Sequence, residues 1–280
     1  MGTSQSSSGS PSGVPMVPPW VPDVPEPGDE LNNGTGNDEQ ETSPAPEQAL
    51  PTIPEIAPAG RWRGSRQSLG SFARSANAAD MRRGVGRYVS GLGGSRTGTR
   101  RFGGTVKTAD RLYGAFSGLA GEQSVETGSQ LDPALLEGRT AREIIDAVIE
   151  AVRPVDGTQD AEASRISISD ALSDLMERFP DADLCKLSQE QREFAIERFV
   201  SYDIYHRFML DVGGKIKSMA PSPNSALSRL REVKDYIRET VADSFQRLRN
   251  ATQRLRSGRV MQIVNQALRR TLEIFEEYII

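Results

Sequence analysis

The feature that most limits the fold of this chain is the helical spacing of its apolar residues near the C-terminus. From Pro223 to the end of the chain, apolar side chains recur every three or four residues, which places them on one face of an α-helix. Gly258, in the short link 257–259, interrupts the pattern. We therefore expect two long helices on either side of this link, folded back on each other as an antiparallel hairpin.

Helical signals continue upstream through the whole of residues 122–280. Thr140 with Glu143, and Ser188 with Gln191, have the spacing of capping boxes that begin helices. A further apolar stripe predicts a helix over about 160–178, ending before Pro180. No segment alternates apolar and polar residues as a strand would. The chain is therefore predicted to be all-α, with an all-helical domain over 122–280.

Residues 61–121 form a basic segment rich in Gly and Arg. Twelve basic residues lie between Arg61 and Arg111, against only Asp80 and Asp110. Apolar spacing predicts two helices, near 72–91 and 96–120, joined by a turn at 91–95. Glycines inside the second helix predict that a neighbouring helix approaches it closely.

Residues 1–60 have the opposite charge and a different character. They hold nine acidic residues, no Lys or Arg, and 12 of the 17 prolines. Such a chain cannot bury enough apolar area to offset its conformational entropy, so we expect a disordered, acidic tail rich in Pro, Ser and Gly. Within it, Val17, Pro18, Pro19 and Trp20 are typical either of a linear docking motif or of a stiff polyproline spacer.

The scarcity of reactive side chains excludes several classes of site. Cys185 is the only cysteine and His206 the only histidine, so no Cys/His zinc site can form and no metal or cofactor is expected. A Ser-His-Asp triad would have to use His206. We found neither a signal peptide nor an apolar run long enough to span a membrane, and we expect a cytoplasmic protein that does not contact the membrane.

Four short motifs suggest chemistry, but a structural interpretation is favoured for each. The glycine-rich stretch 91–99 lacks the Walker A and dinucleotide-binding spacings. His206 has Asp203 and Tyr205 nearby but no nucleophile, and Cys185 lacks a neighbouring base. The carboxylates of Asp181 and Asp183 precede a helix, where acidic residues act as caps.

The basic segment is the strongest compositional hint of a binding function. Its arginines could follow a nucleic-acid backbone, and Trp62, Phe72 and Phe102 could stack on bases. The alternative is a solvated or partner-facing surface, and nucleic-acid binding is not favoured over it. The candidate contacts are Arg82, Arg83, Arg87, Arg96, Arg100 and Arg101.

The first residues offer a different kind of site. After removal of Met1, Gly2 would carry an unhindered α-amine, followed by Thr3 and Ser4. A flexible tail of about 60 residues has a root-mean-square span of about 40 Å. The terminus could therefore enter a partner's active site while the helical domain stays bound elsewhere.

Several stretches together resemble a known family. These are the opening MGTS, VPPWVPD, the segment YVSGLGGSRTGTRRFGGTVKTADRLYGAF over 88–116, and the later strings RPVDGTQDAEASR, FPDADL, QREFAIERF and LSRLREVKDYIRETVADSF. The chain is similar over nearly its whole length to QatB of the bacterial Qat antiphage defence system. The resemblance implies three partners: an ATPase, a QueC-like enzyme and a TatD-like nuclease.

The resemblance also implies a function. In this family QatB is the non-enzymatic member, and the QueC-like enzyme is expected to attach a deazaguanine-type group to the N-terminal glycine, here Gly2, through an amide. The chain would then be a scaffold and a modification substrate, with Thr3 and Ser4 as the recognised context. The alternative is a nucleic-acid-binding adaptor that uses residues 61–111 to recruit a nuclease or to sense phage DNA.

Overall fold

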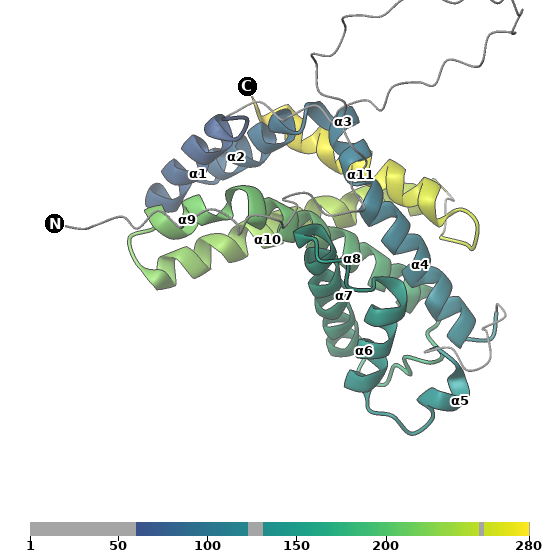
Figure 1. Cartoon of the computed structure of the whole chain (residues 1–280). Coiled ribbons are helices and arrows are strands. Elements are labelled where there is room, and N and C mark those ends of the chain that lie inside the picture. The colour runs from purple at the N-terminus through teal and green to yellow at the C-terminus, as the bar shows by residue number, and fades with distance from the viewer. Residues whose placement is uncertain (1–59, 123–130, 252–254, 280) are drawn as a thin grey trace, which may run out of the picture. The chain divides into compact units, whose positions relative to one another are not determined.

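A computed structural model of the chain describes residues 60–122, 131–251 and 255–279, which belong to one compact unit, Ile56–Ile280. Within these residues the chain forms helices and connecting turns and contains no strand (Figure 1). This confirms the all-α prediction. The helices are α1 (Arg63–Ser75), α2 (Ala78–Gly91), α3 (Gly94–Arg101), α4 (Gly103–Leu119), α5 (Pro133–Leu136), α6 (Ala141–Val152), α7 (Gln159–Arg178), α8 (Gln189–Phe208), α9 (Gly214–Met219), α10 (Pro223–Asn250) and α11 (Val260–Glu276), with a π-helix η1 (Met209–Gly213) and a 3₁₀ turn η2 (Glu277–Ile279).

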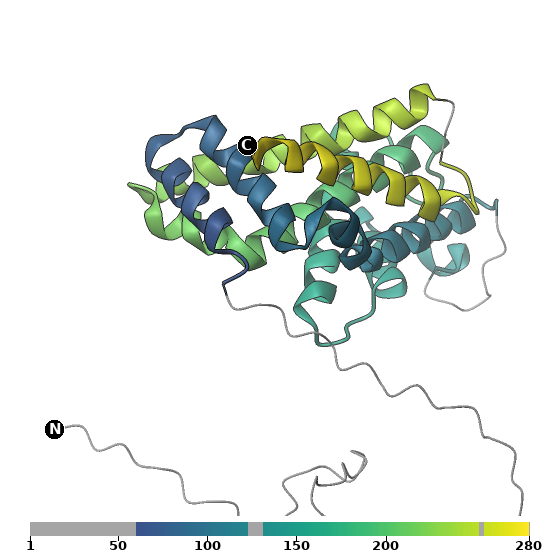
Figure 2. The same ribbon diagram turned by 90° about the horizontal axis from the view of Figure 1, so that it is seen from above.

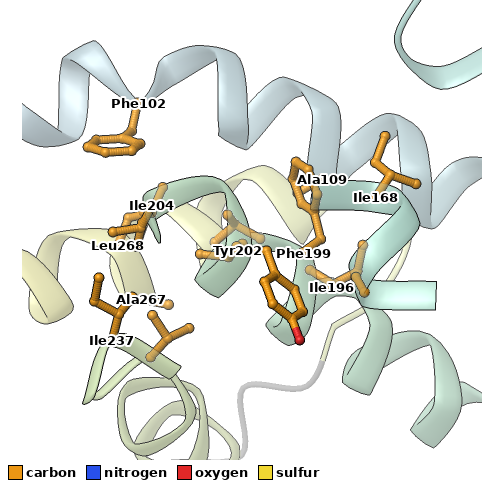
Figure 3. Close-up of a cluster of buried hydrophobic side chains, with 14 of the residues drawn as sticks. Phe102, Ala109, Ile168, Ile196, Phe199, Tyr202, Ile204, Ile237, Ala267 and Leu268 are labelled. Carbon is orange, nitrogen blue, oxygen red and sulfur yellow. The ribbon is translucent and has the colours of Figure 1, made fainter. Parts of the chain in front are cut away.

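Helix α8 is the central element of the unit. It buries side chains on all its faces, as expected for a helix surrounded by others, and it packs against α7, α10 and α4. Phe199 of α8 is fully buried and lies in a cluster with Ala109 of α4, Ile168 of α7 and Leu268 of α11 (Figure 3). One core therefore joins the basic segment to the C-terminal helices.

The predicted C-terminal hairpin is confirmed. Helices α10 and α11 run antiparallel and side by side (Figure 2). Gly258, in their connection, has a φ of +82°, a conformation that glycine adopts without strain. The apolar face of α11 also covers α2, α3 and α4. Both predicted capping boxes are present, at Thr140 with Glu143 and at Ser188 with Gln191.

The basic segment contains four helices where the sequence predicted two. The expected helix over 72–91 is broken at Ala76, whose φ is +62°, and Asn77 caps the new helix α2 by accepting a hydrogen bond from Ala79 N. The expected helix over 96–120 is interrupted only at Phe102, between α3 and α4. The turn at 91–95 forms as predicted, with Gly93 and Gly94 both at positive φ.

Close approaches at glycines occur in α2, and in the second predicted helix at Gly98, where a Cβ would lie 3.1 Å from Leu272 of α11. A Cβ on Gly86 would lie 2.6 Å from the backbone oxygen of Phe275 in α11, and one on Gly91 would lie 2.5 Å from the Trp62 ring. At Gly103 in α4 a Cβ would meet no atom within 4 Å. The expectation for Gly103 was wrong, because that position faces open space.

The chain stays helical at Gly213 and Gly214, although glycine is unfavourable inside a helix. Helix α8 passes through η1 directly into α9. A π-helix adds one residue per turn and is frequent at functional sites. We therefore expect a functional site in the packing around η1.

Candidate functional site

A buried polar cluster lies where α4, α7 and α8 meet. The carboxylate of Asp203 in α8 is fully buried. It accepts hydrogen bonds from Thr105 of α4, from Ser164 Oγ of α7 at 2.7 Å and from Arg207 Nε at 2.9 Å. Donors from three helices thus stabilise a charge that would otherwise be costly to bury, and Arg207 supplies the opposite charge.

Arg207 connects this cluster to the surface. Its guanidinium also binds the carboxylate of Asp160, at the start of α7, and lies over the ring of Phe102, 5.6 Å from the ring centroid. The neighbouring carboxylates raise the pKa of Arg207 and outweigh the effect of its burial. Arg207 therefore stays charged and holds α7, α8 and the α3–α4 joint together.

A hollow of about 370 Å³ opens above Arg207, beside η1. On its wall Tyr88 donates a hydrogen bond to Asp211 Oδ2 at 3.0 Å, and Arg61 Nη2 lies 3.9 Å from Asp211 Oδ1. Burial, and then the negative charge of Asp211, raise the pKa of Tyr88 well above 10. The phenol therefore remains protonated and acts as a hydrogen-bond donor. Arg101 and Leu210 also line the hollow.

Trp62 anchors the first described residues beside this hollow. Its side chain is buried and stacks on Tyr88, with ring centroids 4.7 Å apart. The ring also fills the space left by Gly91. The chain therefore enters the helical unit at a fixed point, at residues 60–62.

An apolar groove of about 410 Å³ lies on the other side of Leu210, between the start of α7 and α9. Ile166 and Leu210 line it, and each has about half of its surface exposed, at 50% and 52%. Met209 of η1 contributes to the same wall. The two hollows share Leu210 and Gln159, so η1 separates a charged pocket from an apolar one.

The six candidate arginines divide into two groups. Arg83 binds Asp80 at 3.0 Å, Arg87 donates to Ser68 Oγ at 3.1 Å, and Arg82 lies over the rings of Tyr236 and Tyr278. These three have partners within the unit. Among the residues that the structure describes, the other three have no carboxylate within 4 Å; they are Arg96, Arg100 and Arg101, all exposed.

The predicted base-stacking role of three aromatic residues is wrong. Trp62, Phe72 and Phe102 have at most 6% of their surface exposed. Their rings pack in the hydrophobic core, so none of the three is available to stack on a nucleic-acid base.

The remaining candidate residues take part in local structural contacts. His206 Nε2 lies 3.0 Å from Asp170 Oδ2, whereas Asp203 is directed to other partners. Burial, assisted by Asp183, raises the pKa of the Cys185 thiol, so it is a poor nucleophile at neutral pH. Across the described ranges, no three His, Cys, Asp or Glu side chains are grouped so as to hold a metal ion.

The glycine-rich turn is occupied by a carboxylate from the chain itself. Ser95 N, in the first turn of α3, donates a hydrogen bond to Glu276 Oε2 at 3.2 Å. A phosphate would have to displace this carboxylate, which agrees with the structural interpretation of residues 91–99. Gly2, Thr3, Ser4 and the segment 17–20 lie outside the described residues.

Two features of the site were not identified in the sequence. The link between Asp203 and Arg207 was visible only as one i, i+4 pair of opposite charges among the several charged residues of α8. Lys107 and Arg111 extend the helical spacing of Arg96 and Arg100, and both are exposed. These two basic residues belong with the exposed arginines.

The fold and the site together define an all-α protein in which central helices surround a neutralised polar cluster. Within its described residues, no helix is both long and apolar enough to cross a membrane. The family model for QatB, the Qat anti-phage system associated protein, matches residues 93–275, more than half of the chain. The chain belongs to this family and is a component of an anti-phage system. No curated protein and no solved structure gave a significant match.

Proposed function

We propose that this protein is a non-catalytic scaffold of the Qat system and the substrate of a QueC-like partner that modifies Gly2. One observation supports the proposal most strongly: the reactive side chains of the helical unit that the structure describes are engaged by other groups of the same unit. The only histidine is paired with Asp170, the only cysteine has a raised pKa, and Asp203 is saturated by three donors. Among the described residues, these three side chains are engaged inside the unit, which leaves its surfaces for contact with a partner.

The anchor at Trp62 supports a role for the preceding residues as a tether. Stacking on Tyr88 fixes the point where these residues join the helical unit. The amine at the other end, on Gly2, is the nucleophile in the proposed reaction. Its nitrogen bonds to an activated carboxyl carbon of a deazaguanine-type donor, the activating group leaves that carbon, and the nitrogen loses one proton.

The partner enzyme would bind the apolar groove beside η1. Ile166 and Leu210 expose apolar surface next to charged residues, an arrangement typical of interface anchors. Replacing both with Ser should weaken co-purification with the QueC-like enzyme by at least about tenfold. The matched control replaces Leu227 and Met261, which are similarly exposed at 55% and 47%. Equal losses in both variants would refute this assignment of the groove.

Intact-mass measurement of the N-terminal peptide tests the modification. The protein is purified from cells that carry or lack the QueC-like neighbour. We expect an added mass on the Gly2 amine only when that enzyme is present. A Gly2→Lys variant, which retains Met1 because position 2 is bulky, should carry no added mass, whereas Ser12→Ala should behave as the natural sequence does. An unmodified Gly2 in both strains would refute the substrate role.

A further inference from the structure

Helices α3 and α4 carry a row of unpaired basic side chains on their solvent side. Arg96, Arg100, Lys107 and Arg111 are exposed, and none of them has a carboxylate within 4 Å among the described residues. Arg101 lies beside the row. The only acidic residue in either helix is Asp110. We call Arg96, Arg100, Arg101, Lys107 and Arg111 the α3–α4 ridge.

Helix geometry brings the ridge residues together in pairs. Arg96 and Arg100 are four residues apart in α3, and Lys107 and Arg111 are four residues apart in α4, so each pair shares one face of its helix. On both sides of the joint the backbone is hydrogen-bonded, because Phe102 N donates to Gly98 O and Val106 N donates to Phe102 O. Each pair spans about 6 Å along its helix, and the two pairs follow each other along the chain on either side of Phe102. The opposite face is buried against α11 and α8.

The surroundings of the ridge favour a polyanion over a protein partner. The exposed positions between the basic residues are small and polar, namely Thr97 and Gly104. The exposed large apolar residues of the unit lie on other elements, so the ridge lacks the apolar anchors that protein interfaces use. It also lacks an exposed aromatic ring, because Phe102 is buried. Binding of single strands relies on base stacking, so the ridge fits a duplex better.

We propose that the α3–α4 ridge binds the phosphate backbone of double-stranded DNA without reading its sequence. The basic side chains contact phosphates and release condensed counterions. Gly103 and Gly104 leave the middle of the ridge without side chains, so a duplex can approach the helix backbone there. This proposal does not involve Gly2, so failure of either proposal leaves the other intact.

Fluorescence anisotropy of the full chain with a labelled 20-base-pair DNA of arbitrary sequence tests the proposal. Five phosphate contacts predict a slope of about −4.5 in log Kobs against log salt concentration. Binding should weaken about 500-fold between 50 and 200 mM NaCl. The same strands unannealed, and a poly-glutamate peptide, are the comparison ligands.

A matched pair of variants locates the contact. The ridge variant carries Arg96→Gln, Arg100→Gln, Lys107→Gln and Arg111→Gln. The control removes the same residue types from four separate elements, through Arg74→Gln, Arg142→Gln, Lys186→Gln and Arg231→Gln, all exposed positions. The ridge variant should lose about 100-fold or more in affinity at 50 mM NaCl and flatten the slope by about 3 to 4.

Two kinds of result would overturn the proposal. Equal losses in both quadruple variants would refute the ridge, and tighter binding of the single strands or of poly-glutamate would refute duplex DNA as the ligand. Circular dichroism checks that both variants are folded. The double variant Lys107→Gln with Arg111→Gln, which changes only α4, should flatten the slope by about 2 and gives a second readout if the quadruple variant is unstable.

Discussion

Replacing Asp203 with Ala should be among the most destabilising single changes in the helical unit. The Asp203 carboxylate is fully buried and accepts hydrogen bonds from Thr105, Ser164 and Arg207. Removing it leaves the hydroxyl groups of Thr105 and Ser164 without this acceptor. The guanidinium of Arg207, which is nearly buried, then has Asp160 as its remaining carboxylate partner. Breaking a buried ion pair by removing one partner costs about 3–5 kcal/mol.

Companion variants separate the buried charge from the lost volume. Thr105→Val and Ser164→Ala each remove one donor and should cost about 1 kcal/mol. The double variant Asp203→Ala with Arg207→Met removes both charges. It should therefore be more stable than the sum of the two single losses predicts, by at least about 1 kcal/mol.

Urea unfolding measures these differences. Circular dichroism follows the helices. In a Trp20→Phe background, fluorescence follows Trp62, which is buried in the core and should become exposed on unfolding. Coincident transitions would justify a two-state treatment. A loss below about 1 kcal/mol for Asp203→Ala, or strictly additive losses in the double variant, would refute the view that Asp203 neutralises Arg207.

Two further predictions follow from individual contacts. Arg192 binds both carboxylate oxygens of Glu122 and lowers the Glu122 pKa below its usual 4.5. The pair therefore stabilises the folded state fully above pH 4.5 and loses this contribution as the pH falls through the lowered pKa. Urea unfolding should show Glu122→Gln to be less stable than the natural chain at pH 7, with the difference vanishing at low pH; a difference that does not change with pH would contradict the pairing. Gly86→Ala should destabilise by about 1–3 kcal/mol, because the new Cβ would lie 2.6 Å from Phe275 O. Its control, Gly103→Ala, should be neutral or stabilising by up to about 1 kcal/mol, and the reverse order of urea midpoints would contradict the packing of α2 against α11.

The apolar spacing and the capping residues of this chain were sufficient to predict α6, α7, α8, α10 and α11, because they are local properties; the continuation of α8 through η1 into α9 was not predicted. Thr140 with Glu143, and Ser188 with Gln191, form their caps within one turn. The stripes of α10 and α11 likewise specify a hairpin, although the connection covers 251–259 and not only the predicted 257–259, because α10 ends at Asn250. The positive charge of residues 61–111 was equally plain in the sequence.

Only the tertiary structure decided how the individual charges are used. Arg83 and Arg96 were equal candidates for nucleic-acid contact in the sequence. In the structure Arg83 binds Asp80, whereas Arg96 faces solvent. Aromatic residues in a basic segment resembled a stacking surface, but burial of Phe72 and Phe102 in the core is more favourable than leaving them exposed. Partners far apart in the sequence decide such outcomes, and the local spacing of residues does not encode them.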